Sequence, residues 1–292
     1  MRTLCLTRFV TASALAFTLA LLLVPAARAQ PAAGDVHQVE APPVKPTGKM
    51  ITLSDFGAED LAYLAIPVTA PTLGIVLVPD AFGLDDFTKN KADWLAAQGY
   101  LVVAVDIYNG HQSTDPGELA NYVANLDNAS IMKTLTAGVR LFHESPKFKV
   151  DHVVAIGWGA GANYVFQAAR ETKGLDGAIT FYGPIEADPA TVHKYNVPLC
   201  AFYADDDPTL THESIQNFQQ AMKEAGNDFS AWYIEAFPGW AHPKSRNYNP
   251  VEDKEAWKVA LPFIARIGAL PAKPDDDSII DKTTDSIKNI FQ

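Results

Sequence analysis

The chain has 292 residues, of which 48% are hydrophobic and 20% charged, with 20 prolines, 18 glycines and two cysteines. This composition excludes a disordered chain, a collagen-like repeat, a coiled coil and a disulfide scaffold. The 23 basic and 34 acidic side chains give a net charge of −11. Such a balance argues against a nucleic-acid-binding protein, because those proteins usually carry a basic face.

Residues 1–29 have the pattern of a secretory signal peptide. Arg2 and Arg8 form a positive start, residues 10–24 are almost wholly apolar, and Ala27 and Ala29 are small residues at the cleavage positions. The apolar run is shorter than the roughly 20 residues that span a bilayer, so a signal peptide is favoured over a membrane anchor. We expect cleavage near Ala29, export to the periplasm or the medium, and no stable membrane anchor.

The mature chain divides into a linker, a domain and a tail. Residues 30–49 are rich in proline and read as a linker, residues 50–268 as one domain, and residues 269–292 as an acidic tail with an amphipathic pattern. The domain length fits one large α/β unit. The tail either packs on the domain as a strap or docks a protein partner. Cys200 is the only cysteine of the mature chain, which excludes an internal disulfide.

The hydrophobic pattern predicts alternating strands and helices along the domain. Strands are expected at 61–66, 73–78, 101–105, 150–156, 178–182, 199–203 and 231–234. Helices are expected to begin at Asp85-Asp86, at Ser130, at 160 and at Thr211, and the last core helix is expected to end at Gly268. This order predicts an α/β fold with a mostly parallel sheet of about eight strands and helices on both faces.

One stretch, Gly157-Trp158-Gly159-Ala160-Gly161, joins a buried strand to a helix through a tight turn. A nucleophile elbow has this layout, with a serine or cysteine at the apex and small residues two positions away. Here the apex is Gly159, so the shape is present without the nucleophile. The same glycines match a dinucleotide fingerprint, but several strands precede them and no acidic residue follows the next strand. We therefore predict no nucleotide cofactor.

Two polar residues follow later strands in the order that α/β-hydrolases use. Asp207 comes after one predicted strand and His242 after the next. In such an arrangement the acid orients the imidazole, which takes a proton from the attacking group. Each residue also has a simpler reading, Asp207 as a turn residue before Pro208 and His242 as a loop histidine.

Five segments together resemble the dienelactone hydrolase family. They are residues 78–84 (VPDAFGL), 98–100 (QGY), 105–108 (VDIY), 181–183 (FYG) and 238–242 (PGWAH). The resemblance extends over about residues 50–268 and implies the α/β-hydrolase fold and the hydrolysis of ester or lactone bonds. It does not specify a substrate.

The resemblance also assigns roles to individual residues. It implies Asp207 as triad acid, His242 as triad histidine and Gly159 at the position of the nucleophile. Backbone N–H groups of Ala81 and Ala160 match the oxyanion-hole donors, which need no particular side chain.

The remaining matches to the family concern residues expected to line the substrate pocket. Asp80 stands where the family has a glutamate that contacts the nucleophile. Arg246 matches one of two arginines that hold a substrate carboxylate, and Gly110 stands at the position of the other. Trp158 and Trp240 are expected to line the pocket, because both flank loops at the carboxyl ends of strands.

The glycine at the nucleophile position leaves three hypotheses open. In the first, His242 and Asp207 activate a water molecule that attacks the ester or lactone directly. In the second, the protein is a non-catalytic, exported pseudoenzyme that binds a small acyl or lactone ligand, or a partner. In the third, Ser245 or Cys200 replaces the missing nucleophile, although Ser245 also reads as a loop hydroxyl and Cys200 as a core residue.

Metal and cofactor sites are not predicted. The remaining histidines lack ligand spacing, and no HExxH or paired CxxC occurs. The run Asp205-Asp206-Asp207 is compatible with calcium, but a loop with one functional acid and two solvated neighbours is favoured.

Overall fold

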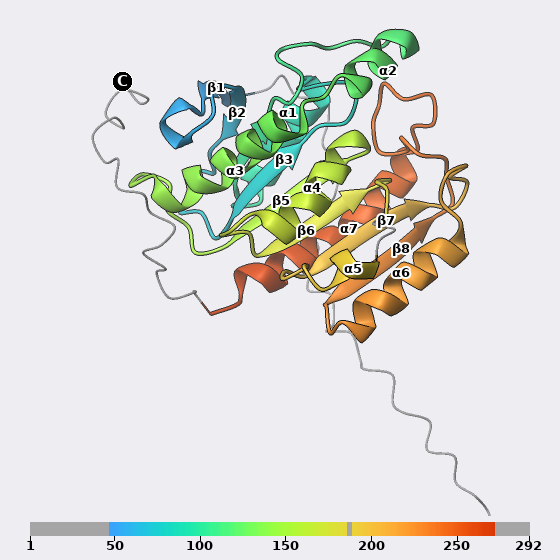
Figure 1. Cartoon of the computed structure of the whole chain (residues 1–292). Helices are drawn as coiled ribbons and strands as arrows, with labels where there is room; N and C mark the ends of the chain where they lie inside the picture. Colours follow the sequence, from blue (N-terminus) through green and yellow to red (C-terminus); the bar gives the residue numbers. More distant parts are fainter. Residues whose placement is uncertain (1–46, 186–188, 272–292) are drawn as a thin grey trace, which may run out of the picture. The chain divides into compact units, whose positions relative to one another are not determined.

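The computed structural model describes residues 47–185 and 189–271 (Figure 1). The predicted signal peptide, most of the linker and residues 272–292 of the tail lie outside these ranges. Within them, no helix is both long and apolar enough to cross a membrane.

Eight strands form one sheet in the described residues. They are β1 (Lys49–Thr52), β2 (Leu61–Ala65), β3 (Gly74–Val78), β4 (Leu101–Val105), β5 (Val153–Trp158), β6 (Gly177–Phe181), β7 (Leu199–Ala204) and β8 (Phe229–Ile234). Their order across the sheet is β1-β2-β4-β3-β5-β6-β7-β8. Strands β3 to β8 pair in parallel, while β1 and β2 are antiparallel to their neighbours. The predicted mostly parallel sheet is confirmed.

The helices connect these strands. The α-helices are α1 (Asp86–Ala97), α2 (Pro116–Ala124), α3 (Asn128–Glu144), α4 (Ala160–Glu171), α5 (Pro189–Val192), α6 (His212–Glu224) and α7 (Pro250–Gly268), and a 3-10 turn η1 covers Ser54–Phe56. Helix α7 ends at Gly268, as the sequence predicts.

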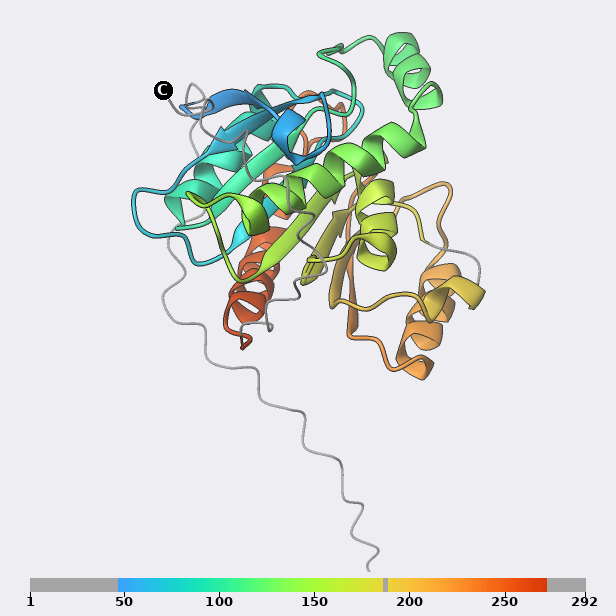
Figure 2. The ribbon, with the colours of Figure 1, turned by 60° about the vertical axis from the view of Figure 1, so that its left-hand side comes forward.

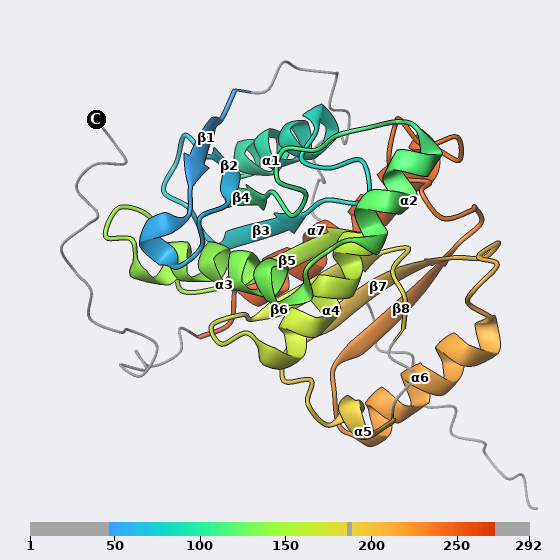
Figure 3. The ribbon, with the colours of Figure 1, turned by 45° about the horizontal axis from the view of Figure 1, so that its top comes forward.

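Both faces of the sheet are covered, which explains why its central strands are apolar throughout. Every residue of β3, β4 and β5 is buried. One hydrophobic cluster joins the sheet to α3, α4 and α6, and a second joins the other face to α1 and α7. Figure 3 shows α7 behind the strands that α3 and α4 cover in front. Each fully buried Val, Leu or Ile contributes about 1.5–3 kcal/mol relative to exposure.

Several features differ from the predicted elements, and the short elements η1 and α5 are among those not predicted. Strand β1 begins at Lys49, inside the segment read as linker, and adds an exposed edge to the sheet. Helix α2 is not predicted, since none of its residues is buried and it therefore lacks an apolar stripe; Asp115 and Pro116 define its start. Figure 2 shows α2 projecting beyond the other helices. Helix α3 is capped by Asp127 rather than by Ser130.

This topology brings distant segments of sequence together at one edge. The carboxyl ends of β3, β5, β6 and β7 lie side by side because these strands are parallel neighbours. The residues that follow them therefore form the candidate site, as is usual in open α/β sheets.

Candidate active site

The turn between β5 and α4 has the geometry of a nucleophile elbow. Gly159 is at its apex with φ +49° and ψ −115°, a conformation that is strained for residues with a side chain. A Cβ atom on Gly157 would lie 2.7 Å from the carbonyl oxygen of Gly161, and one on Gly161 would clash with the carbonyl oxygen of Pro79. Both flanking positions therefore require glycine, because strand and helix approach too closely for a side chain.

The apex itself is not crowded. A Cβ atom on Gly159 would lie 3.5 Å from Asp80 Cβ and 3.6 Å from Tyr182 Cε2, which are ordinary van der Waals distances. The space beside the Cα atom of Gly159 thus accommodates a group about the size of a methyl group or a water molecule.

A pocket of about 760 Å³ lies over this turn. Its size is typical of sites for small molecules. Its lining comes from the loops after β3, β5, β6, β7 and β8, from the start of α4 and from the segment around the end of α2. The lining residues are Asp80, Ala81, Phe82, Val123, Leu126, Gly159, Ala160, Asn163, Tyr164, Tyr182, Gly183, Pro184, Asp207, Pro208, Thr209, Leu210, Pro238 and Gly239. The structure therefore brings Asp80, Gly159 and Asp207 to one pocket together with both predicted oxyanion donors.

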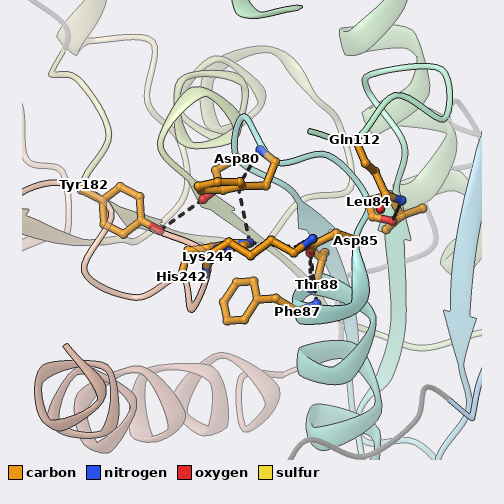
Figure 4. A network of polar contacts seen from close by, with 10 residues as sticks. Asp80, Leu84, Asp85, Phe87, Thr88, Gln112, Tyr182, His242 and Lys244 are labelled. Atoms are coloured by element: carbon orange, nitrogen blue, oxygen red, sulfur yellow. Dashed lines mark hydrogen bonds and ion pairs between the residues drawn. The ribbon is translucent and has the colours of Figure 1, made fainter. Parts of the chain in front are cut away.

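The Asp80 carboxyl group is the buried acid of this pocket, with 6% of the residue exposed. Its Oδ1 accepts a hydrogen bond from the Phe82 N–H at 3.1 Å, and the Tyr182 hydroxyl lies 3.5 Å from its Oδ2 (Figure 4). Burial raises the pKa of Asp80 to about 6, although the electrostatic interaction with His242 and the hydrogen bond from the Phe82 N–H oppose the rise. Asp80 is thus a base that is largely ionised at neutral pH.

His242 lies behind Asp80 and is fully buried. Its ring stacks on Phe82 with centroids 4.1 Å apart and contacts Phe87 at 4.4 Å. Its Nδ1 accepts a hydrogen bond from the Lys244 N–H at 3.1 Å, so the neutral ring carries its proton on Nε2. That Nε2 lies 3.9 Å from Asp80 Oδ1. Phe82 and Asp80 line the pocket and His242 does not.

Asp85 lies closer to His242 than Asp80 does. The sequence predicts Asp85 only as part of a helix start. Asp85 Oδ1 caps α1 by accepting from the N–H groups of Phe87 and Thr88. Its Oδ2 lies 3.5 Å from His242 Nε2 and 2.8 Å from Lys244 Nζ. Burial alone would raise the pKa of Asp85, but the contacts with His242 and Lys244 outweigh it and hold the pKa below its ordinary value.

Sequence reasoning thus misses Asp85 and Lys244. The available signal is positional: Asp85 follows the loop after one central strand, and Lys244 lies two residues after His242, so both belong to the same edge of the sheet.

Asp207 makes different contacts from those that the resemblance implies. Its Oδ1 accepts from the N–H and the hydroxyl of Thr209 and from the N–H of Leu210. Among the described residues the acidic partners of His242 are Asp80 and Asp85, and Asp207 is not one of them. The turn before Pro208, which the sequence offers as the simpler reading, fixes the Asp207 carboxylate at the wall of the pocket.

The two tryptophans that the sequence places in the pocket walls lie in the core instead. Trp158 and Trp240 are both fully buried and absent from the lining. Each packs on Phe181, at centroid distances of 5.3 and 5.7 Å. Trp158 is the last residue of the central strand β5, and Trp240 lies in the turn after β8, but both belong to the hydrophobic cluster between the sheet and helices α1 and α7. Arg246 is exposed and also absent from the lining.

The predicted oxyanion donors are positioned in the pocket. Ala81 and Ala160 both line it, and Ala160 is the first residue of α4, where backbone N–H groups have no partner within the helix. In the described part of the chain neither N–H donates to a backbone carbonyl outside the regular elements. Both are available to a bound oxygen atom.

Neither alternative nucleophile reaches this pocket. Cys200 is buried on β7, and burial raises the pKa of its thiol to about 12, so the thiolate is not formed at neutral pH. The Ser245 hydroxyl accepts from the Asn247 N–H and is not part of the lining. Across the described ranges, no group of three or more His, Cys, Asp or Glu side chains is arranged to hold a metal ion.

Similarity to known proteins agrees with the architecture. The chain is 24% identical over 223 residues to a Bradyrhizobium protein named "Probable 2-oxo-3-(5-oxofuran-2-ylidene)propanoate lactonase", covering 71% of this chain and 90% of the relative. It is 23% identical over 205 residues to a carboxymethylenebutenolidase homolog from Xenopus tropicalis, covering 66% and 80%.

Solved structures show the same fold. A dienelactone hydrolase-like promiscuous phosphotriesterase from metagenomic libraries superposes with a TM-score of 0.68 at 20% identity, covering 76% of this chain and 98% of that one. A thermophilic esterase from Thermogutta terrifontis gives 0.60 at 16% identity, covering 79% and 96%. The model of the dienelactone hydrolase family matches residues 61–268, which include the elbow, the pocket and His242. The chain therefore belongs to the dienelactone hydrolase family and has its α/β-hydrolase fold.

Proposed function

We propose that the protein is an exported hydrolase of small ester or lactone bonds in which Asp80 activates a water molecule beside Gly159. The observation that carries this proposal is the position of Asp80: its Cβ is 3.5 Å from where a Cβ of Gly159 would be, and its pKa is about 6. A carboxylate with such a pKa is suited to general-base catalysis near neutral pH. This base replaces the His242–Asp207 pair that the resemblance implies.

The reaction needs no covalent intermediate. The water oxygen forms a bond to the carbonyl carbon while Asp80 takes one of its protons, and the carbonyl π electrons move to the oxygen. The N–H groups of Ala81 and Ala160 stabilise that oxyanion. When the intermediate collapses, the C–O bond to the leaving group breaks and Asp80 returns the proton to the departing oxygen. The products are a carboxylic acid and an alcohol, or one hydroxy acid from a lactone.

His242, Asp85 and Lys244 act behind the base. The imidazole directs its Nε2 toward both carboxylates, and Asp85 holds it there through a contact of 3.5 Å. The electrostatic interaction with the His242 imidazole opposes the effect of burial and limits the rise of the Asp80 pKa. These three are positioning residues, because Phe82 and Asp80 separate them from the pocket.

The test compares hydrolysis of p-nitrophenyl acetate by wild type, Asp80→Asn and His242→Ala. We expect Asp80→Asn to lower kcat/KM by about 10²-fold or more, the usual contribution of a general base. His242→Ala should have a smaller effect, because its action is indirect. Equal rates for wild type and Asp80→Asn, both above the background rate, would refute Asp80 as the base.

A second candidate is a binding protein without turnover. The separation of His242 from the pocket favours this reading, and so does the absence of Asp207 from its partners, since the described residues form no triad. It predicts that an ester raises the melting temperature while the same sample releases no acid or alcohol. A partner bound through the C-terminal tail stays a prediction, since residues 272–292 lie outside the described structure.

A further inference from the structure

Among the described residues that line the pocket over Gly159, the charged side chains are all negative. Two of its described lining residues are ionisable acids, Asp80 and Asp207, and the described lining includes no lysine, arginine or histidine. The arginine pair that the family resemblance implies for a substrate carboxylate is missing here, because Gly110 replaces one member and Arg246 is exposed elsewhere. A carboxylate entering this pocket would lose hydration and face two like charges.

Asp207 is fixed in a way that leaves it available to a ligand. Three donors from Thr209 and Leu210 hold its Oδ1, so the carboxyl group cannot swing away from the wall. Its Oδ2 has no recorded partner among the described residues. Because the bonds to Oδ1 fix the carboxylate, Oδ2 of Asp207 can accept a hydrogen bond from a charged N–H group or lie beside a quaternary ammonium.

Aromatic rings complete the site. Phe82, Tyr164 and Tyr182 line the pocket together with the two acids. Burial and the Asp80 charge raise the pKa of Tyr182 well above its ordinary value, so its ring stays neutral. Carboxylates combined with neutral aromatic faces are the surroundings that proteins use for organic cations.

We infer that the pocket selects acyl compounds that carry a positive charge, such as esters of amino alcohols, and rejects those that carry a carboxylate. The inference rests on the proposed function only in taking this pocket as the ligand site. Asp80 acts as the base at the bond that is hydrolysed, and Asp207 interacts with the charged group of the substrate. Asp207 is then the specificity-determining residue, a role different from the triad acid that the family resemblance implies.

The probes are three butyrate esters of similar size. Butyrylcholine carries a quaternary ammonium, 3,3-dimethylbutyl butyrate is its neutral isostere, and 3-(butyryloxy)propanoate carries a carboxylate. Both kcat/KM and the dissociation constant, the latter by calorimetry on the full mature protein, are measured for each. We expect the cationic ester to be preferred over the neutral one by about tenfold, and the anionic ester to be the poorest of the three.

The variant Asp207→Asn should reduce the preference for the cationic ester about three- to fivefold, which corresponds to the loss of one partly exposed charge contact. Asp206→Asn is the matched control, since Asp206 is exposed and outside the lining, and its preference should equal that of wild type. High salt should weaken the preference in wild type.

The readouts separate the two proposals. Binding with the expected charge order but without turnover would support the inference and contradict the hydrolase. Turnover of all three esters at similar kcat/KM and affinity would overturn the inference and leave the hydrolase standing. A preference for the anionic ester, or equal effects of Asp207→Asn and Asp206→Asn, would also overturn it. So would a failure of all three esters to bind.

Discussion

The imidazole Nε2 of His242 lies 3.5 Å from Asp85 Oδ2, an acid that comes from the start of helix α1. The family resemblance implies an acid from the loop after β7 in that place. His242 lies outside the lining of the pocket, and Asp80 is the acid of the lining that lies beside the elbow. The first three of the following predictions depend on this arrangement.

The first prediction concerns Asp85→Asn, which preserves the shape of the cap but removes the charge. His242 and Lys244 would then face a neutral amide, and we expect the free energy of unfolding at pH 7 to fall by about 2 kcal/mol, below the 3–5 kcal/mol for a fully buried pair because Lys244 is partly exposed. The measurement is urea denaturation monitored by tryptophan fluorescence.

The pH dependence of that loss has a definite sign. The folded-state pKa of Asp85 is lowered, so its stabilising contribution is present above the unfolded pKa and disappears as the pH falls through the folded pKa. Wild type and Asp85→Asn should therefore converge in acid. Asp86→Asn, at an exposed neighbour, is the control. A constant difference between wild type and Asp85→Asn down to low pH would contradict the account.

The second prediction concerns the stability of Asp80→Asn. The folded-state pKa of Asp80 is raised from 3.8 to about 6, so its favourable contribution is complete below about pH 4 and is lost as the pH rises through 6. Two pKa units correspond to about 3 kcal/mol. The variant should therefore be more stable than wild type at pH 8 by up to that amount and similar to it at pH 4. Parallel stability curves for the two proteins would rule out a raised Asp80 pKa.

The third prediction distinguishes the effect of filling the space beside Gly159 from the effect of backbone strain at a residue with positive φ. Gly159→Ala places a methyl group beside Asp80 at ordinary contact distance but at φ +49°, so we expect a loss of about 1–2 kcal/mol in stability and a large loss of hydrolysis as the water position is filled. Gly226→Ala is the matched control, because its φ is +79° and nothing lies within 4 Å of the added Cβ. It should lose similar stability and keep its activity. Full activity in Gly159→Ala would place the reacting water elsewhere.

The fourth prediction tests the placement of Trp158 in the core. Truncation of a fully buried tryptophan removes contacts with Phe181 and Phe87, and Trp158→Ala should cost about 3–5 kcal/mol of stability. Trp158→Phe should cost clearly less and leave KM within a factor of two. If Trp158→Phe instead raises KM severalfold without loss of stability, the indole is a pocket wall after all.

Most of the strands and helices can be predicted from the sequence, because the pattern of apolar residues matches the faces that are buried in the structure. The apolar runs at β3, β4 and β5 belong to strands covered on both faces, so each is recognised without its neighbours. Helix α2 and strand β1 are not predicted, because both are mostly exposed and therefore lack the pattern of apolar residues that a buried face produces.

The candidate site is less readable because its contacts depend on side-chain direction. The sequence places Asp80, Gly159 and Asp207 at one edge of the sheet, and the pocket contains all three. It does not show that the His242 ring lies beside Asp85, that Thr209 donates to Asp207, or that Trp158 and Trp240 are fully buried. These outcomes are settled by packing among several loops, which local pattern does not encode.

The most direct test of the central claim is the pH dependence of kcat/KM for a neutral ester, measured with wild type and Asp80→Asn. If Asp80 is the base, wild-type kcat/KM rises with pH, passes its midpoint near 6 and then stays level, while Asp80→Asn is slow throughout and shows no such midpoint. A wild-type midpoint near 6 that persists at full rate in Asp80→Asn would assign the base to another residue and contradict the account.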